Sequence, residues 1–286
     1  MRVGIGLPNP VPDCPGDLLP RWAAAAEGRG FPTLATIDRV AFPNHDSLIA
    51  HAAAAAVTER IELMPNILLL PTRNPVLLAK ETATIASISG GRLTLGVGVG
   101  GRQDDFVATG TSFEDRGRRT DEMLQTMTKA WRGEPVAGSP EPVTPQVPGE
   151  RVPLLIGGMS DATLRRTVQH GTGWTAGGMP ANRIAPFVER VRAAWRDAGK
   201  DGEPRIVALA YFSLGDEVED ASYQYLRHYY GIFGDHAEAI ARSAHRSAGA
   251  IKDTIAAFSD VGVDDLILDP TVADISQVDR LADVVM

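Results

Sequence analysis

Short hydrophobic runs alternate with longer amphipathic runs along the whole chain, and this rhythm predicts the fold. The runs with strand character are residues 2–7, 33–38, 61–70, 93–99, 152–158, 173–178, 205–214 and 265–270. Each is followed by a longer segment with hydrophobic positions at helical spacing. Eight strand–helix units imply a parallel sheet, which closes most simply as a (β/α)8 barrel, an α/β fold. An open, doubly wound sheet is the structural alternative.

Two intervals are longer than one strand–helix unit requires. A chain of 286 residues is within the size of a single barrel, so we expect one domain over residues 1–286. The proline-rich interval 133–153 and the aromatic interval 216–246 are expected to be insertions. Insertions at the C-terminal face of a barrel usually shape a substrate pocket. For the aromatic interval, surface decoration or a subunit contact is an equally open interpretation.

Composition and charge narrow the classes of partner. The formal net charge of −8 argues against nonspecific binding to nucleic acid or to an anionic membrane. No run approaches the ~20 apolar residues of a membrane span, and the N-terminal run lacks the length of a signal peptide. Cys14 is the only cysteine, which excludes an intramolecular disulfide and fits a cytoplasmic protein. The histidines show no metal-binding spacing, so no metal site is predicted.

The stretch 91–105 contains a match to the nucleotide-binding pattern G-x-G-x-x-G, at Gly96, Gly98 and Gly101. A dinucleotide fingerprint turns directly from a strand into a helix. Here the glycines begin inside the fourth strand, and residues 102–117 are predicted to be a loop. The pattern therefore favours a different use of these glycines.

Strand periodicity places Gly96, Gly98 and Gly100 on one face, with Thr94, and the apolar residues on the other. The apolar face, namely Leu93, Leu95, Val97 and Val99, is expected to pack against the outer helices. Glycines in a strand indicate close approach by another group. That group is either a planar ring at the mouth of the barrel or crowded neighbours inside it. Gly4 and Gly6 repeat the pattern in the first strand.

Two later turns are candidates for holding a phosphate. They follow the fifth and sixth strands and consist of Gly157, Gly158, Met159 and Ser160, and of Gly177, Gly178 and Met179. Helix N-termini late in a barrel commonly bind phosphate groups. A flat slot together with a phosphate site favours a phosphorylated planar cofactor.

Ser160 also has a second interpretation. It follows a strand and precedes a helix, as does the nucleophile of α/β-hydrolases. A hydrolase would also need Asp216 with either His228 or His245. The simpler interpretation makes Ser160 the N-cap of a helix.

Four blocks of the sequence, residues 68–110, 116–133, 152–178 and 248–270, resemble the bacterial-luciferase-like family of flavin- and deazaflavin-dependent oxidoreductases. The resemblance implies a barrel with the cofactor ring at its C-terminal mouth. It also implies a bulge with a non-prolyl cis peptide in the third strand, which we place at Asn66-Ile67, behind the ring. Dimers are common in this family, so a homodimer is one open state of assembly.

The resemblance also bears on the cofactor. Asp38 matches an acidic residue near the ring in deazaflavin-dependent members, although Arg39 stands where those members often have histidine. Val99 stands where FMN-dependent members have an arginine that binds phosphate. The match at Asp38 and the valine at position 99 favour coenzyme F420, with FMN as the alternative. The arginine at position 39 argues against proton transfer by a histidine. Arg118 or Arg119 could still serve an FMN phosphate.

The sequence therefore predicts an oxidoreductase that transfers a hydride between F420 and a small organic substrate. Asp38 or a bound water would handle the proton, while Arg39 and Arg73 would orient the substrate. Residues 102–113 and 216–246 are expected to line the substrate pocket. The alternatives are an FMN-dependent monooxygenase that uses molecular oxygen, a non-catalytic flavin-binding protein, and a serine hydrolase.

Overall fold

The computed structural model describes residues 1–286 apart from residue 217, and its strands form one parallel sheet. The order in the sheet is β3-β2-β1-β9-β8-β7-β6-β5-β4. The strands are β1 (Arg2–Gly6), β2 (Thr33–Thr36), β3 (Glu62–Pro65), β4 (Leu68–Leu69), β5 (Leu95–Gly98), β6 (Leu154–Gly157), β7 (Gly173–Thr175), β8 (Arg205–Phe212) and β9 (Asp265–Pro270). All eight predicted strands are confirmed, and the third is divided into β3 and β4.

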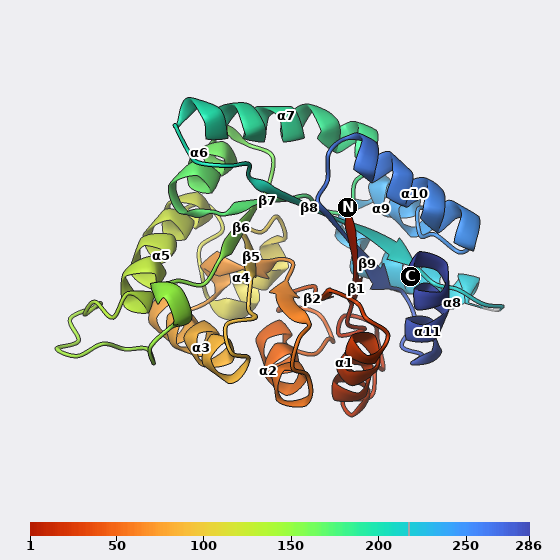
Figure 1. Ribbon diagram of the computed structural model, residues 1–286, viewed down its shortest axis with the longest axis horizontal. Helices are drawn as coiled ribbons and strands as arrows, with labels where there is room; N and C mark the ends of the chain where they lie inside the picture. Colours follow the sequence, from red (N-terminus) through yellow and green to blue (C-terminus); the bar gives the residue numbers. More distant parts are fainter. Residues whose placement is uncertain (217) are drawn as a thin grey trace.

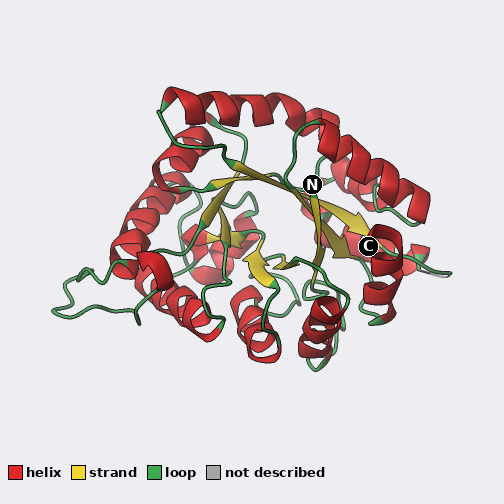
Figure 2. Ribbon diagram, viewed as in Figure 1, coloured by secondary structure: helices red, strands yellow, loops and turns green. Residues whose placement is uncertain are grey.

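The helices surround this sheet on its outer side, except α4, which is drawn within the ring of helices (Figures 1 and 2). They are α1 (Leu18–Gly28), α2 (Ser47–Val57), α3 (Pro75–Ile88), α4 (Gln103–Thr109), α5 (Arg116–Trp131), α6 (Asp161–His170), α7 (Ala181–Asp197), α8 (Glu219–Tyr229), α9 (Asp235–Arg242), α10 (Ala248–Asp260) and α11 (Ser276–Val285), with 3-10 turns η1 (Leu70–Thr72), η2 (Pro148–Glu150) and η3 (Gly231–Phe233). The prediction of a loop over 102–117 is wrong for α4.

The divided third strand closes the barrel. The backbone N–H of Leu63 donates to Arg92, and the N–H of Thr94 donates to Leu63, so β3 meets the chain just before β5. After the interruption, β4 pairs with β5 directly. The interruption is the peptide Asn66-Ile67, which is cis, as the sequence resemblance implied. The fold is therefore a (β/α)8 barrel.

The two insertions lie at opposite ends of the barrel. Residues 133–153 join the end of α5 to the start of β6, so they lie at the N-terminal ends of the strands. They form the long loop at the left of Figure 1. The expectation of a C-terminal-face insertion is therefore wrong for this segment. The 216–246 interval, with α8, η3 and α9, follows β8 and does lie at the C-terminal ends.

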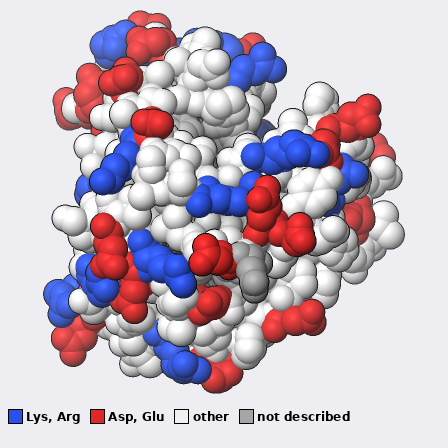
Figure 3. Space-filling view, turned by 90° about the vertical axis from the view of Figure 1, so that its right-hand side faces the viewer, with Lys and Arg blue, Asp and Glu red and all other residues white. Residues whose placement is uncertain are grey.

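An ion-pair network fastens the strands at the N-terminal end of the barrel. Arg205 binds Glu62 at 2.6 Å and Asp265 at 2.8 Å, joining β8 to β3 and β9. Burial alone would raise the pKa of Glu62, but the hydrogen bonds and charge of Arg205 outweigh burial and hold this pKa below its usual value. On the face shown in Figure 3, Lys and Arg side chains are interspersed with Asp and Glu side chains.

The glycines of β5 make room for a neighbouring strand. A Cβ at Gly96 would lie 2.5 Å from the carbonyl oxygen of Pro65, and one at Gly98 would lie 2.0 Å from Cδ1 of Ile67. The expectation of a bare strand face therefore needs correction, because Ile67 covers it. The opposite face packs on the outer helices at Leu93, Leu95 and Val97, as predicted, whereas Val99 lines a pocket.

The glycines of β1 also make room for side chains of a neighbouring strand. A Cβ at Gly4 would meet Cδ1 of Ile267 at 2.6 Å, and one at Gly6 would meet Oδ1 of Asp269 at 2.0 Å. Asp269 is 3% exposed, and no cation or hydrogen-bond donor among the described residues compensates its burial. Burial raises the pKa of Asp269 to about 8. The barrel interior therefore contains a carboxyl group that is mainly neutral at pH 7.

The substitution Gly96→Ala tests the close approach of β3 to β5. The added methyl would press on backbone, which cannot move aside as a flexible side chain can. We expect a loss of about 1–3 kcal/mol or more in the free energy of unfolding. Gly101→Ala is the matched control, because nothing lies within 4 Å of its Cβ position. Equal unfolding midpoints in urea for the two variants would contradict this packing.

Asp269→Asn tests the buried acid. Between about pH 4, the unfolded pKa of aspartate, and pH 8, the folded state holds the extra proton, so stability falls as pH rises by up to ~1.4 kcal/mol per pH unit. The asparagine variant lacks this component, so its free energy of unfolding should fall less between pH 5.5 and pH 7.5. Urea titrations at pH 5.5 and at pH 7.5 measure the free energy of unfolding. The exposed Asp253→Asn should follow the wild type, and parallel behaviour of all three proteins would show that Asp269 is ionised in the fold.

Candidate functional site

A cavity of about 840 Å³ opens at the C-terminal ends of the barrel strands. Its walls come from the ends of β2, β4, β5, β6, β7 and β8 and from segments of α4, α5, α6, α8 and η3. Ligand sites in barrel enzymes lie at this face, and the volume is near the upper end of the usual range for ligand pockets. The cavity therefore has room for a cofactor ring with a substrate beside it.

The structure brings most of the predicted site residues together in this cavity. Its lining includes Asp38, Asn66, Ile67, Gly98, Gly100, Gly157, Gly158, Met159, Ser160 and Gly177. Arg39 is not part of the lining. Gly178 and Met179 instead line a smaller cavity of about 370 Å³, which shares Leu209 and Tyr211 with the larger one.

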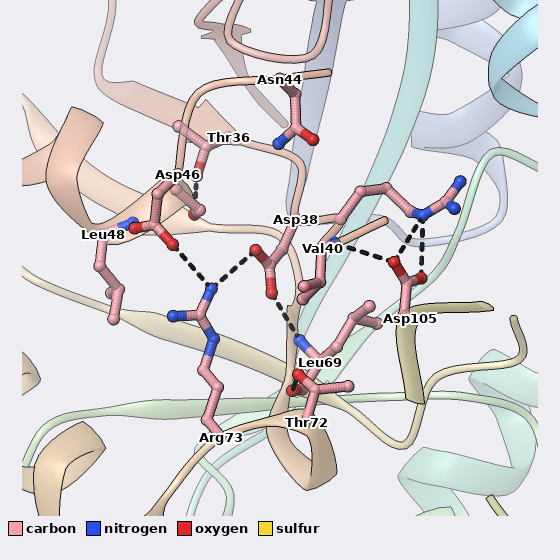
Figure 4. Close-up of polar contacts among 12 residues, drawn as sticks. Thr36, Asp38, Val40, Asn44, Asp46, Leu48, Leu69, Thr72, Arg73 and Asp105 are labelled. Carbon is pink, nitrogen blue, oxygen red and sulfur yellow. Dashed lines mark hydrogen bonds and ion pairs between the residues drawn. The ribbon is translucent and has the colours of Figure 1, made fainter. Parts of the chain in front are cut away.

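Asp38 is held at the end of β2 by two donors. Its Oδ2 accepts from the backbone N–H of Leu69 at 3.0 Å, and its Oδ1 accepts from Arg73 at 2.9 Å. Arg73 also binds Asp46, so one guanidinium lies between two carboxylates (Figure 4). Burial raises the pKa of Asp38, and the charge of Arg73 offsets this only in part. Asp38 thus retains a proton more readily than an exposed aspartate.

Arg39 is committed to α4. Its Nε donates to Asp105, its Nη2 donates to Asp104 at 2.7 Å, and its side chain is 4% exposed. Asp105 also accepts from the backbone N–H groups of Val40 and Ala41, and Figure 4 shows the first of these bonds. This buried ion pair fixes the segment after Asp38 against α4.

The floor of the cavity contains an unpaired donor. Asn66 Oδ1 accepts from Thr175 Oγ1 at 2.7 Å, an orientation that fits the hydroxyl as donor. Its buried Nδ2 has no acceptor among the described residues. Buried amide groups are normally paired, so this nitrogen, on a residue that lines the cavity, is a candidate donor to a ligand.

One side of the cavity is suited to an anion. Ser160 caps α6, its Oγ accepting from the backbone N–H of Thr163, as the helix-cap interpretation predicted. Arg116 and Arg166 line the cavity beside it. Arg166 is paired with Asp121 at 2.7 Å, whereas Arg116 is stacked on Phe113 and forms no ion pair with any described carboxylate.

Arg118 and Arg119, which we considered for a phosphate, lie elsewhere. Arg118 is exposed and pairs with Asp115 and Glu122, while Arg119 donates to the carbonyls of Pro71 and Arg73. Neither is part of the cavity lining. Sequence inspection missed Arg116, whose only signal is its place at the start of α5.

The hydrolase geometry is absent from the described residues. Ser160 Oγ contacts only Thr163. His245 lies within hydrogen-bond distance of Thr254, and the ring of His228 packs on Phe42. Neither His228 nor His245 is therefore positioned to activate Ser160.

An aromatic wall faces the cavity from the 216–246 insertion. It consists of Tyr229, Tyr230 and Phe233, and Tyr211 of β8 lies beside it. Arg102 and Asp105 contribute from the 102–113 segment. The prediction that these two segments line the pocket is confirmed, although the sequence did not single out Arg102 or the tyrosines.

No described helix combines the length and apolar character needed to cross a membrane. A family model described as luciferase-like monooxygenase matches residues 6–285. An uncharacterised protein of Mycobacterium bovis is 28% identical over 222 residues, which is 67% of this chain and 77% of that protein.

Two solved structures show the same fold. An F420-dependent secondary alcohol dehydrogenase in complex with an F420-acetone adduct has a TM-score of 0.79 at 20% identity, over 99% of this chain and 98% of that one. The oxygenating constituent of 3,6-diketocamphane monooxygenase from Pseudomonas putida, in complex with FMN, has a TM-score of 0.77 at 17% identity, over 100% and 98%. Because the family model spans nearly the whole barrel, this chain belongs to the luciferase-like monooxygenase family of oxidoreductases.

Proposed function

We propose that this protein is an oxidoreductase that uses coenzyme F420 to transfer a hydride to or from a small organic substrate. The observation that carries the proposal is the unpaired amide of Asn66 in the floor of a cavity large enough for a planar ring. A ring carbonyl or ring nitrogen of a deazaflavin or flavin supplies the missing acceptor. The bound cofactor supplies the hydride chemistry, and the protein supplies binding, orientation and proton handling.

The residues around the cavity divide this work. Ile67 supports the ring from behind, on the side of Gly98 and Gly157. The N-terminus of α6 with Ser160 and Arg116 would bind a phosphate. Asp38 would hold or release the proton of the substrate, because it lines the cavity and its pKa is raised by burial. Arg39 would position Asp38 through the segment it fixes to α4, without touching the substrate.

Two observations favour F420 over FMN. Val99 stands in the cavity at the position where FMN-dependent relatives would place an arginine, and Arg118 and Arg119 are committed elsewhere. The turn at Gly158, Met159 and Ser160 is exposed, so an anionic tail longer than one phosphate can continue into solvent. FMN is the second candidate, because Arg116 beside α6 suits a single phosphate equally well. An FMN-dependent enzyme of this family would use molecular oxygen as co-substrate.

Titration of the apoprotein with F420 and with FMN tests the proposal. Trp174 is a suited reporter, because it is buried and its Nε1 donates to the carbonyl of Gly158 at 2.7 Å. We expect saturable quenching of tryptophan fluorescence, with a lower dissociation constant for F420. Tight binding of neither compound would overturn the proposal. Binding without turnover of any tested substrate would favour a non-catalytic carrier.

Arg116→Gln tests the phosphate end of the cavity. Loss of a charge-assisted hydrogen bond should raise the dissociation constant of FMN or F420 by about tenfold or more. Affinity for riboflavin and for the phosphate-free deazaflavin chromophore should change little, since neither carries a phosphate. Arg118→Gln is the matched control from the same helix, and its affinities should stay within about twofold of the wild type. Equal losses for ligands with and without phosphate would contradict the assigned role.

A further inference from the structure

Arg102 lines the cavity within a cage of aromatic rings from the 216–246 insertion. Its guanidinium carbon is 4.4 Å from the ring centre of Tyr229, 5.1 Å from that of Tyr230 and 5.3 Å from that of Phe233. One nitrogen, Nη2, donates to the backbone carbonyl of Tyr229 at 3.2 Å. The buried Nε has no acceptor among the described residues. At least this donor of the arginine is therefore unused.

The charge of Arg102 is not balanced by the described part of the chain. The nearest acids in sequence, Asp104 and Asp105, are bound to Arg39. The groups that act on Arg102 are the phenols of Tyr229, Tyr230 and Tyr211. Burial raises the pKa of each of these phenols, so they are neutral at physiological pH. Aromatic faces attract a cation but leave its charge in place.

We propose that Arg102 binds the carboxylate of an organic substrate whose body is aromatic or apolar. The proposal rests on the oxidoreductase function proposed above and specifies the class of its substrate. A carboxylate offers two oxygens to a planar guanidinium, and such charge-assisted pairs are strong where water is excluded. The rings of Tyr230 and Phe233 and the apolar side chain of Leu209 line the cavity around the site, which suits an apolar body.

Arg102 and Arg116, the residue proposed to bind phosphate, contact different segments of the chain. Arg116 packs on Phe113, and the neighbouring carbonyl of Gly117 accepts from Arg166 of α6. Arg102 packs instead on the 229–233 segment, which belongs to the insertion after β8. Two arginines with different surroundings in one cavity fit the binding of a phosphorylated cofactor together with a carboxylate substrate.

The test compares acids with their neutral amides on the cofactor-loaded protein. Benzoate, phenylacetate and hexanoate are titrated by calorimetry against benzamide, phenylacetamide and hexanamide. We expect each acid to bind at least about tenfold more tightly than its amide, and this preference to fall as NaCl is raised from 50 to 500 mM. In Arg102→Gln the preference should fall below about twofold, while Arg102→Lys should retain part of it.

Controls separate this role from a structural one. Cofactor affinity and melting temperature are measured for each variant, and the exposed Arg118→Gln should keep the full preference for acids. The proposal is wrong if no acid binds more tightly than its amide, or if the preference survives in Arg102→Gln. It is also wrong if that variant loses cofactor affinity by the same factor, which would assign Arg102 to the cofactor. If the proposed function itself is wrong, the wild-type protein will not bind the cofactor. That result is distinguishable from a loss of acid preference in a protein that does bind the cofactor.

Discussion

The cavity depends on the packing of one side chain, Ile67, against strands that have no side chains of their own at that point. Cβ atoms at Gly98 and Gly157 would lie 2.0 Å and 3.4 Å from Cδ1 of Ile67, and one at Gly96 would meet the backbone just before it. The third strand meets the fourth on both sides of Asn66-Ile67, first at Leu63 and then along β4, and Asn66 and Ile67 line the cavity between these contacts. The strand that closes the barrel therefore also supplies the floor of the site.

The arginines of the barrel fall into two groups. One group joins structural elements through ion pairs, and the other lines the cavity without an ion pair. Arg205 fastens strands at the N-terminal end of the barrel, Arg39 fixes the segment after Asp38, and Arg166 joins α6 to α5. Each has a carboxylate partner, so its charge is already balanced. Arg102 and Arg116 have none among the described residues, and both line the cavity. Both are half-buried, so water solvates their charges only in part, and a bound anion is the complement that we propose at these two positions.

The sequence predicted the barrel well because its strands are buried on both faces, and such strands stand out as apolar runs. The shared face of Gly96 and Gly98 was also right, whereas Gly100 lies beyond the strand with a positive φ. The group that fills the space beside Gly96 and Gly98 was not predictable, since Ile67 comes from another strand. Helix α4 was missed because it is short and one of its buried residues, Asp105, is polar. That burial is explained only by Arg39, which is 66 residues away in the chain.

The same limit applies to the binding residues. Asp38 and the Asn66-Ile67 bulge were found through resemblance to a family, and the N-cap role of Ser160 followed from local pattern. Arg102 and Arg116 have no comparable signal. Their significance comes from the absence of a carboxylate partner, and absence of a partner is a property of the folded arrangement. A count of arginines in the sequence cannot distinguish them from the paired ones.

Two buried aspartates show why position decides which acid can act. Burial raises the pKa of both Asp38 and Asp269, so each holds a proton more readily than an exposed carboxyl group. Asp269 has its oxygen against Gly6, inside the barrel, and is not part of the cavity lining. Asp38 lines the cavity, and its link to Arg73 keeps an ionised form accessible. A group that exchanges protons with a substrate must be reachable from the cavity, and of these two acids only Asp38 lines it.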